Sequence, residues 1–125
     1  RWNSMLELTK SEYQILTYLF KFDQALTKTE LVERVPDLNS NTTALVLASL
    51  LKKGYLEVNK VKYSRTVLAR AYTPSISLVE FLKDHFGEKA IQKLIAYTIN
   101  SIEDNERLDQ FIQLIKERKR NIKTN

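Results

Sequence analysis

The sequence predicts a mainly α-helical protein that contains one small β-hairpin. Three observations support this fold class. Apolar residues recur at intervals of three and four along most of the chain, which is the spacing of one face of a helix. Capping-box patterns, in which Ser or Thr precedes Glu by three residues, mark several helix starts. The stretch after Gly54 instead alternates between polar and apolar residues, as a strand does.

Composition limits the classes of protein to consider. A length of 125 residues suits one domain, or one compact domain with an appended helical segment, and 43% hydrophobic residues suffice for a core. Cysteine is absent, which excludes disulfides, thiolate metal sites and a cysteine nucleophile. The sequence shows no apolar run of membrane-spanning length and no apolar region of a signal peptide at its start. We therefore predict a cytoplasmic protein.

The first two predicted helices begin at capping boxes. The box Thr9–Glu12 precedes apolar residues at helical spacing, and the box Thr27–Glu30 precedes a shorter apolar stripe. Pro36 ends the second helix because the residue before a proline avoids the helical conformation.

The stretch from Leu38 to Gly54 predicts a third helix, around which the chain is arranged. It begins with short polar residues that suit a helix N-terminus, and Gly54 suits a left-handed C-cap. One side is expected to be buried: Thr43, Val46, Leu47, Leu50 and Leu51. The other side starts with hydrogen-bonding residues and ends with lysines, which is typical of a helix that reads a DNA major groove.

A predicted β-hairpin follows the third helix. Its connection, residues 60–66, is longer than a tight turn and carries three cations beside Tyr63. Three helices followed by a hairpin with a basic tip match the plan of a winged helix-turn-helix. We therefore expect residues 5–75 to form a DNA-binding domain. The net charge of this part is positive, as DNA binding favours, because residues 1–75 hold 11 Lys and Arg against 7 Asp and Glu.

Two sets of residues are predicted to contact duplex DNA. The predicted base contacts are Asn39, Ser40, Asn41, Thr42, Ala44, Leu45 and Ala48. The predicted phosphate contacts are Lys28, Lys52, Lys53, Lys60, Lys62 and Arg65. Asn41 is the preferred reader because a carboxamide can form two hydrogen bonds with adenine.

The remaining chain, residues 76–120, predicts helices that bind a second copy of the protein. Their apolar stripes exceed what the small winged module could cover, so we expect a homodimer; folding back onto the module as a monomer is the alternative. The predicted interface is Leu78, Leu82, Ile91, Leu94, Ile95, Leu108, Phe111, Ile112 and Ile115. Residues 121–125 are expected to be a frayed basic tail rather than a second DNA contact.

No catalytic, metal-binding or cofactor-binding constellation is recognisable. The single histidine, His85, has no Ser, Cys or metal-ligand partner at a useful spacing. The only glycines, Gly54 and Gly87, cannot build a loop that cradles phosphate. We therefore predict that the protein is not an enzyme and that it needs no metal or cofactor.

Several motifs resemble the penicillinase and methicillin-resistance repressor family, which includes copper-responsive repressors. They are LTKSEYQILTYLF, TELVER, SLLKKGYL, YTP, FLKDHFG and NERL, and the likeness covers roughly residues 6–118. The resemblance implies a homodimeric winged-helix repressor that binds a palindromic operator through its front part and dimerises through its C-terminal helices. The expected partners are double-stranded DNA, a second copy and an inducer or protease of unknown identity, with no membrane.

The chain departs from that family at three places. Ala44 and Ser49 stand where members usually carry basic residues, and Ala96–Tyr97 replaces the Asn–Phe site at which antibiotic-responsive members are cleaved. The terminal cysteines of copper-responsive members are missing. Neither induction by cleavage nor induction by copper can therefore be inferred for this chain from the resemblance. A winged-helix module that binds protein instead of DNA is the alternative function, because Ala44, Leu45 and Ala48 would also suit an apolar partner.

Overall fold

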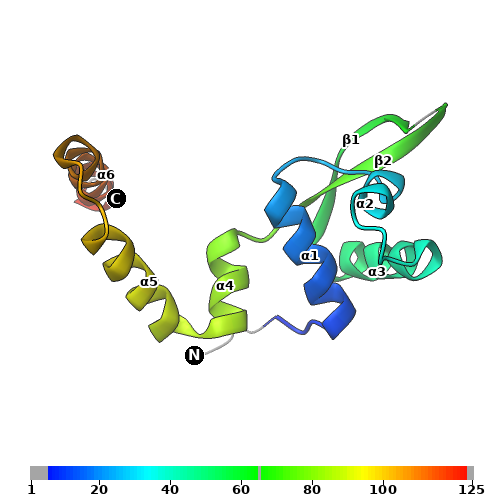
Figure 1. The fold of residues 1–125 in the computed structure, drawn as a ribbon, viewed down its shortest axis with the longest axis horizontal. Helices are drawn as coiled ribbons and strands as arrows, with labels where there is room; N and C mark the ends of the chain where they lie inside the picture. Colours follow the sequence, from blue (N-terminus) through cyan, green and yellow to red (C-terminus); the bar gives the residue numbers. More distant parts are fainter. Residues whose placement is uncertain (1–5, 65, 124–125) are drawn as a thin grey trace. The chain divides into compact units, whose positions relative to one another are not determined.

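The computed structural model describes residues 6–64 and 66–123, apart from the side chains of Lys60, Lys62 and Ser64. The elements are α1 (Lys10–Phe22), α2 (Lys28–Arg34), α3 (Ser40–Lys53), β1 (Leu56–Ser64), β2 (Val67–Pro74), α4 (Leu78–Phe86), α5 (Glu88–Asn100) and α6 (Asn105–Lys123) (Figure 1). This order confirms the predicted fold class, a winged helix followed by C-terminal helices. The chain divides into two compact units after Asp84.

Helix starts follow the capping boxes that the sequence contains. The Thr9 hydroxyl accepts a hydrogen bond from the Glu12 amide at 3.2 Å, and the Glu12 carboxylate accepts one from the Thr9 amide at 2.8 Å. Reciprocal bonds of the same kind open α2 and α4. Each pair satisfies two backbone donors that the first turn of a helix leaves free. The capping boxes predicted at Thr9 and Thr27 are therefore confirmed, and Ser77 and Glu80 form a third.

The core of the first unit lies between α1, α2, α3 and the base of the hairpin. Leu16, Leu31 and Leu50 are fully buried there. α4 joins this core through Phe81, whose ring lies 5.6 Å from Tyr13 and 5.1 Å from Phe20 between centroids. The first unit thus extends past the predicted domain boundary at residue 75, because Phe81 completes its core.

Asp84 anchors the end of α4 to the start of the chain. Its carboxylate accepts hydrogen bonds from the Leu6 amide at 2.8 Å and from the Tyr13 hydroxyl. These bonds join residues more than seventy positions apart, as the separations of 78 and 71 show. The N-terminal segment and α4 therefore close one side of α1.

The hairpin is antiparallel and its strands are longer than predicted. β1 continues to Ser64 and β2 begins at Val67, where the sequence predicted a connection over residues 60–66. Val61 and Tyr63 continue the alternation of a strand, so backbone pairing extends to the tip. A separate bridge joins Leu26 to Tyr72, and the two backbone hydrogen bonds have N···O distances of 3.2 and 2.9 Å. This bridge ties the hairpin to the segment before α2.

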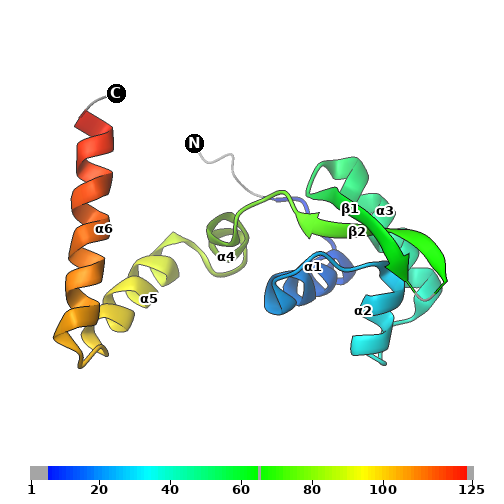
Figure 2. The same ribbon diagram turned by 90° about the horizontal axis from the view of Figure 1, so that it is seen from above.

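The second unit contains α5 and α6, joined by the link 101–104 (Figure 2). No residue of either helix is buried among those that the structure describes. α6 continues to Lys123, so the predicted frayed tail is helical up to that residue. Ile122 extends the helical pattern, and cations in the last turn interact favourably with the helix C-terminus.

Candidate nucleic-acid interface

The outward side of α3 is uncovered by the described part of its own chain. Thr43 and Leu47 face inward and are each 2% exposed, whereas Leu45 is 73% exposed. The residues predicted to read bases are all exposed: Asn39, Ser40, Asn41, Thr42, Ala44, Leu45 and Ala48. One continuous helix face therefore presents a polar start and an apolar middle to solvent.

Two asparagines at the start of α3 differ in their surroundings. Asn39 is the N-cap, and its side-chain oxygen accepts a hydrogen bond from the Thr42 amide at 3.0 Å. This bond favours the helix start and holds the Asn39 side chain at the helix end. Asn41 lies one residue inside the helix and is exposed. Its carboxamide is therefore the better placed of the two for a hydrogen bond outside the chain.

The predicted phosphate contacts differ in their surroundings. Lys52 is exposed at the end of α3, and Lys28 is half-buried at the start of α2. Lys53 is held by its own chain, since its ammonium donates to the Glu12 carboxylate at 2.7 Å and to the Glu7 carbonyl at 2.8 Å. We therefore leave Lys53 out of the proposed phosphate contacts. Arg65 and the side chains of Lys60 and Lys62 lie outside the described residues.

Glu12 forms a buried polar centre that connects α1 to α3. Its side chain is 3% exposed and accepts hydrogen bonds from Lys53 at 2.7 Å, the Ser49 hydroxyl at 2.7 Å and the Thr9 amide at 2.8 Å. Burial raises the pKa of Glu12, but the hydrogen bonds from these three groups and the Lys53 charge outweigh it and lower the pKa from 4.5 to about 2. The carboxylate is therefore ionised and fixes the last turns of α3 against the first turn of α1.

Sequence reasoning missed this centre. It assigned Glu12 only to a capping box and Lys53 only to phosphate. The two residues are 41 positions apart, and no local pattern indicates that they meet. The structure shows that the Glu12 carboxylate both caps α1 and binds α3. Its Oε1 accepts hydrogen bonds from the Thr9 amide and from Lys53, and its Oε2 accepts one from the Ser49 hydroxyl.

The lowered pKa of Glu12 predicts a defined pH dependence of stability. Because the folded pKa of about 2 lies below the unfolded value of 4.5, the contribution is complete above pH 4.5 and declines as the pH falls toward 2. Between pH 7 and pH 3 the protein should lose about 2 kcal/mol through this group. Urea unfolding of the wild type and the Glu12→Gln variant measures it, since the variant lacks this titration. An unchanged difference between the two proteins at both pH values would contradict the assignment.

The protein is a winged helix-turn-helix protein, as shown by helices α1 to α3, the paired strands and the exposed face of α3. The model of the penicillinase repressor family matches residues 8–117, and the chain belongs to that family. No curated protein shows a significant match to the chain. The family assignment places the protein among DNA-binding transcriptional repressors.

The described residues contain no group of three or more His, Cys, Asp and Glu side chains arranged to hold a metal ion. In residues 6–64 and 66–123, no helix combines the length and apolar character that crossing a bilayer requires.

Proposed function

We propose that the protein is a homodimeric cytoplasmic repressor that binds a palindromic operator and catalyses no reaction. The observation that supports DNA binding is the exposed face of α3, with hydrogen-bonding residues at its start and Lys52 at its end. Two such helices related by a two-fold axis would enter successive major grooves, and a palindromic site would match that symmetry. Family membership supports the same function.

The chemistry of the side chains assigns base contacts and phosphate contacts to different residues. Asn41 would read adenine, and Ala44 or Ala48 would lie against thymine methyl groups. Lys52 and Lys28 would neutralise phosphates and release counterions, together with the basic residues of the hairpin. Affinity then derives mainly from the cations, and sequence preference derives from the neutral face.

The homodimer is supported by the second unit. Leu94, Ile95, Ile112 and Ile115 are each about half exposed, from 48% to 56%, in the single chain. Apolar stripes of this extent in two consecutive helices are typical of a subunit interface. A second copy would cover them with the same stripes by symmetry.

Titration of duplex DNA at two salt concentrations tests the proposed function. A repressor that displaces counterions should lose affinity steeply between 50 and 200 mM salt, by about 10³ or more for six phosphate contacts. The competing function, a module that binds protein through the exposed Leu45 region, predicts little DNA binding at either concentration. Absence of binding at low salt would therefore refute the repressor proposal.

Replacing Asn41 with alanine should relax sequence preference without abolishing binding. A two-bond contact to adenine is worth about 1–3 kcal/mol of discrimination, and the variant should lose that preference at one position of each half-site. Selection from random duplexes measures the change. Lys52→Gln is the matched control, since it should weaken all sequences alike and lower the salt slope by about 1 per contact. An unchanged preferred sequence in the Asn41→Ala variant would rule out this residue as the reader.

A further inference from the structure

A hollow with a volume of about 210 Å³ opens between α1 and the first turns of α3. Its apolar surface comes from Ile15, which is buried, and from the half-buried Leu38 and Val46. Its exposed polar rim consists of Ser11, Gln14, Asp37, Asn39 and Thr42. This volume equals that of roughly seven water molecules, so the α1–α3 hollow has room for one small organic molecule.

Thr43 presents an unpaired hydroxyl to the α1–α3 hollow. The residue lines the hollow and is only 2% exposed. Its hydroxyl forms no hydrogen bond with a described residue, and the described residues contain no side-chain oxygen that is both sealed from solvent and without a partner. The hydroxyl is therefore accessible through the hollow. A ligand that reaches it would satisfy a polar group that folding leaves unpaired.

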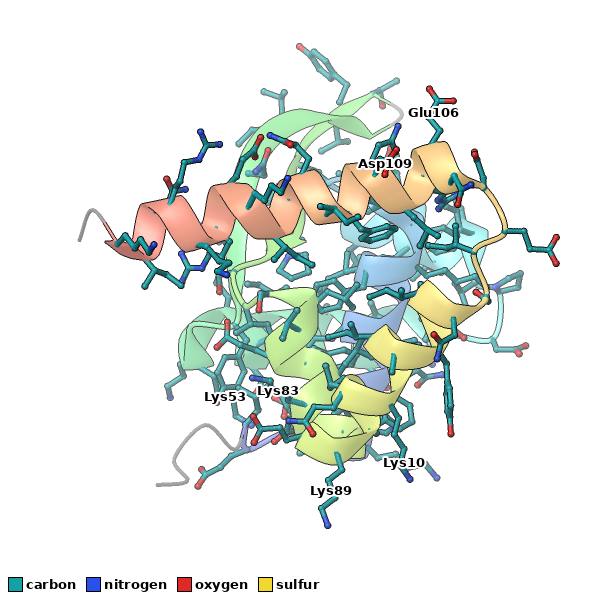
Figure 3. The ribbon with its side chains drawn as sticks, turned by 90° about the vertical axis from the view of Figure 1, so that its left-hand side faces the viewer. Lys10, Lys53, Lys83, Lys89, Glu106 and Asp109 are labelled. Carbon is teal, nitrogen blue, oxygen red and sulfur yellow. The ribbon has the colours of Figure 1, made fainter. Side chains whose placement is uncertain are left out.

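The charge of the α1–α3 hollow is opposite to that of the winged module around it. Asp37 is the one charged side chain among the described residues that line the hollow, and it forms no ion pair with them. Lys10, next to Ser11 in the sequence, projects into solvent and does not line the hollow (Figure 3). The hollow therefore disfavours a phosphate group and favours a cation.

We propose that the α1–α3 hollow binds a small organic cation with an apolar body, and that this ligand competes with DNA. The exposure of the lining residues orients the ligand. Its ammonium group would lie at the exposed rim beside Asp37, and its apolar body would pack against Ile15 and Val46. A hydroxyl at its other end would bind Thr43, which lies deeper.

The competition follows from two residues that belong to both sites. Asn39 and Thr42 line the α1–α3 hollow and are also among the proposed base contacts, so this part of the inference rests on the proposed DNA-binding function. They are joined to each other by the hydrogen bond from the Thr42 amide to the Asn39 side chain. A ligand that lies against them occupies space that a base edge needs. By linkage, DNA and ligand then lower each other's affinity by the same factor.

Nuclear magnetic resonance of the full chain tests the site in the absence of DNA. Tyramine is the probe, because an apolar ring joins its ammonium to a hydroxyl. We expect saturable shifts of the side-chain amide signals of Gln14 and Asn39, unchanged signals of Gln24 and Gln113, and a dissociation constant of about 1 mM. The matched anion, 4-hydroxyphenylpropanoate, should cause no saturable shift.

Two substitutions test the two ends of the ligand separately. Asp37→Asn should weaken tyramine binding about two- to fivefold, as expected for an exposed ion pair. Thr43→Val should weaken tyramine about two- to tenfold but leave 2-phenylethylamine unaffected, since that amine lacks the hydroxyl. Asp37 is exposed, so its replacement keeps the test decisive even if Thr43→Val is destabilised. Shifts that do not saturate, equal shifts with the anion, or unchanged tyramine binding in both variants would refute the site.

Fluorescence anisotropy with duplex DNA tests the competition. When tyramine is present at ten times its own dissociation constant, the dissociation constant for DNA should rise about tenfold. Potassium chloride at equal ionic strength is the control, and Asp37→Asn should show a smaller rise at the same tyramine concentration. Unchanged DNA affinity of the tyramine-bound protein overturns the competition. A protein that binds tyramine but no DNA instead refutes the proposed repressor function and supports the ligand site.

Discussion

Replacing Lys53 with methionine is expected to lower the free energy of unfolding by about 1–3 kcal/mol, because the Lys53 side chain is itself 34% exposed and Glu12 keeps its hydrogen bonds to Ser49 and Thr9. The substitution leaves the carboxylate of Glu12, whose side chain is 3% exposed, without the ammonium that lies 2.7 Å away. A buried charge without its partner costs far more than a surface ion pair contributes. Urea unfolding at pH 7 measures the loss.

Lys52→Met is the matched control for this prediction. Lys52 is adjacent in sequence and exposed, so its replacement should change stability by less than about 0.5 kcal/mol. Equal effects of the two substitutions would show that the ion pair does not stabilise the fold. Combining Lys53→Met with Glu12→Gln should cost less than the sum of the single changes, because the second change removes the unpaired charge.

Replacing Ile112 and Ile115 with aspartate is expected to convert the proposed homodimer into monomers. Burial of an isoleucine side chain contributes about 1.5–3 kcal/mol, and a symmetric dimer contains each residue twice. The two changes also bring carboxylates into an apolar contact, so the dimer dissociation constant should rise by at least about 100-fold. Sedimentation velocity measures the change, and circular dichroism shows whether the helices persist.

Leu45→Asp is the control for this second prediction. Leu45 is also a large exposed apolar residue, with 73% exposure, but it lies on the outward side of α3, which we propose contacts DNA. Its replacement should leave the dimer intact and weaken DNA binding. If the Ile112→Asp, Ile115→Asp variant kept the wild-type dissociation constant, the α6 stripe would not be part of the interface.

The helices were predictable because their signals are local. A capping box spans four residues and an apolar stripe repeats every three or four, so α1, α2 and α4 begin where the pattern indicates. The inward and outward sides of α3 followed from the same periodicity. The hairpin was predicted with a connection that was too long, because alternating lysines next to Val61 and Tyr63 suit either a basic loop or an exposed strand.

The sequence by itself determined the element types, the exposed side of α3 and the family to which the chain belongs. Only the tertiary structure decided that α4 completes the core of the first unit through Phe81 and that Lys53 binds Glu12. Backbone hydrogen bonding and helical periodicity act within a few residues, so they can be followed along the chain. The partner of a charged side chain depends on which helices pack together, and packing joins residues that are far apart in sequence.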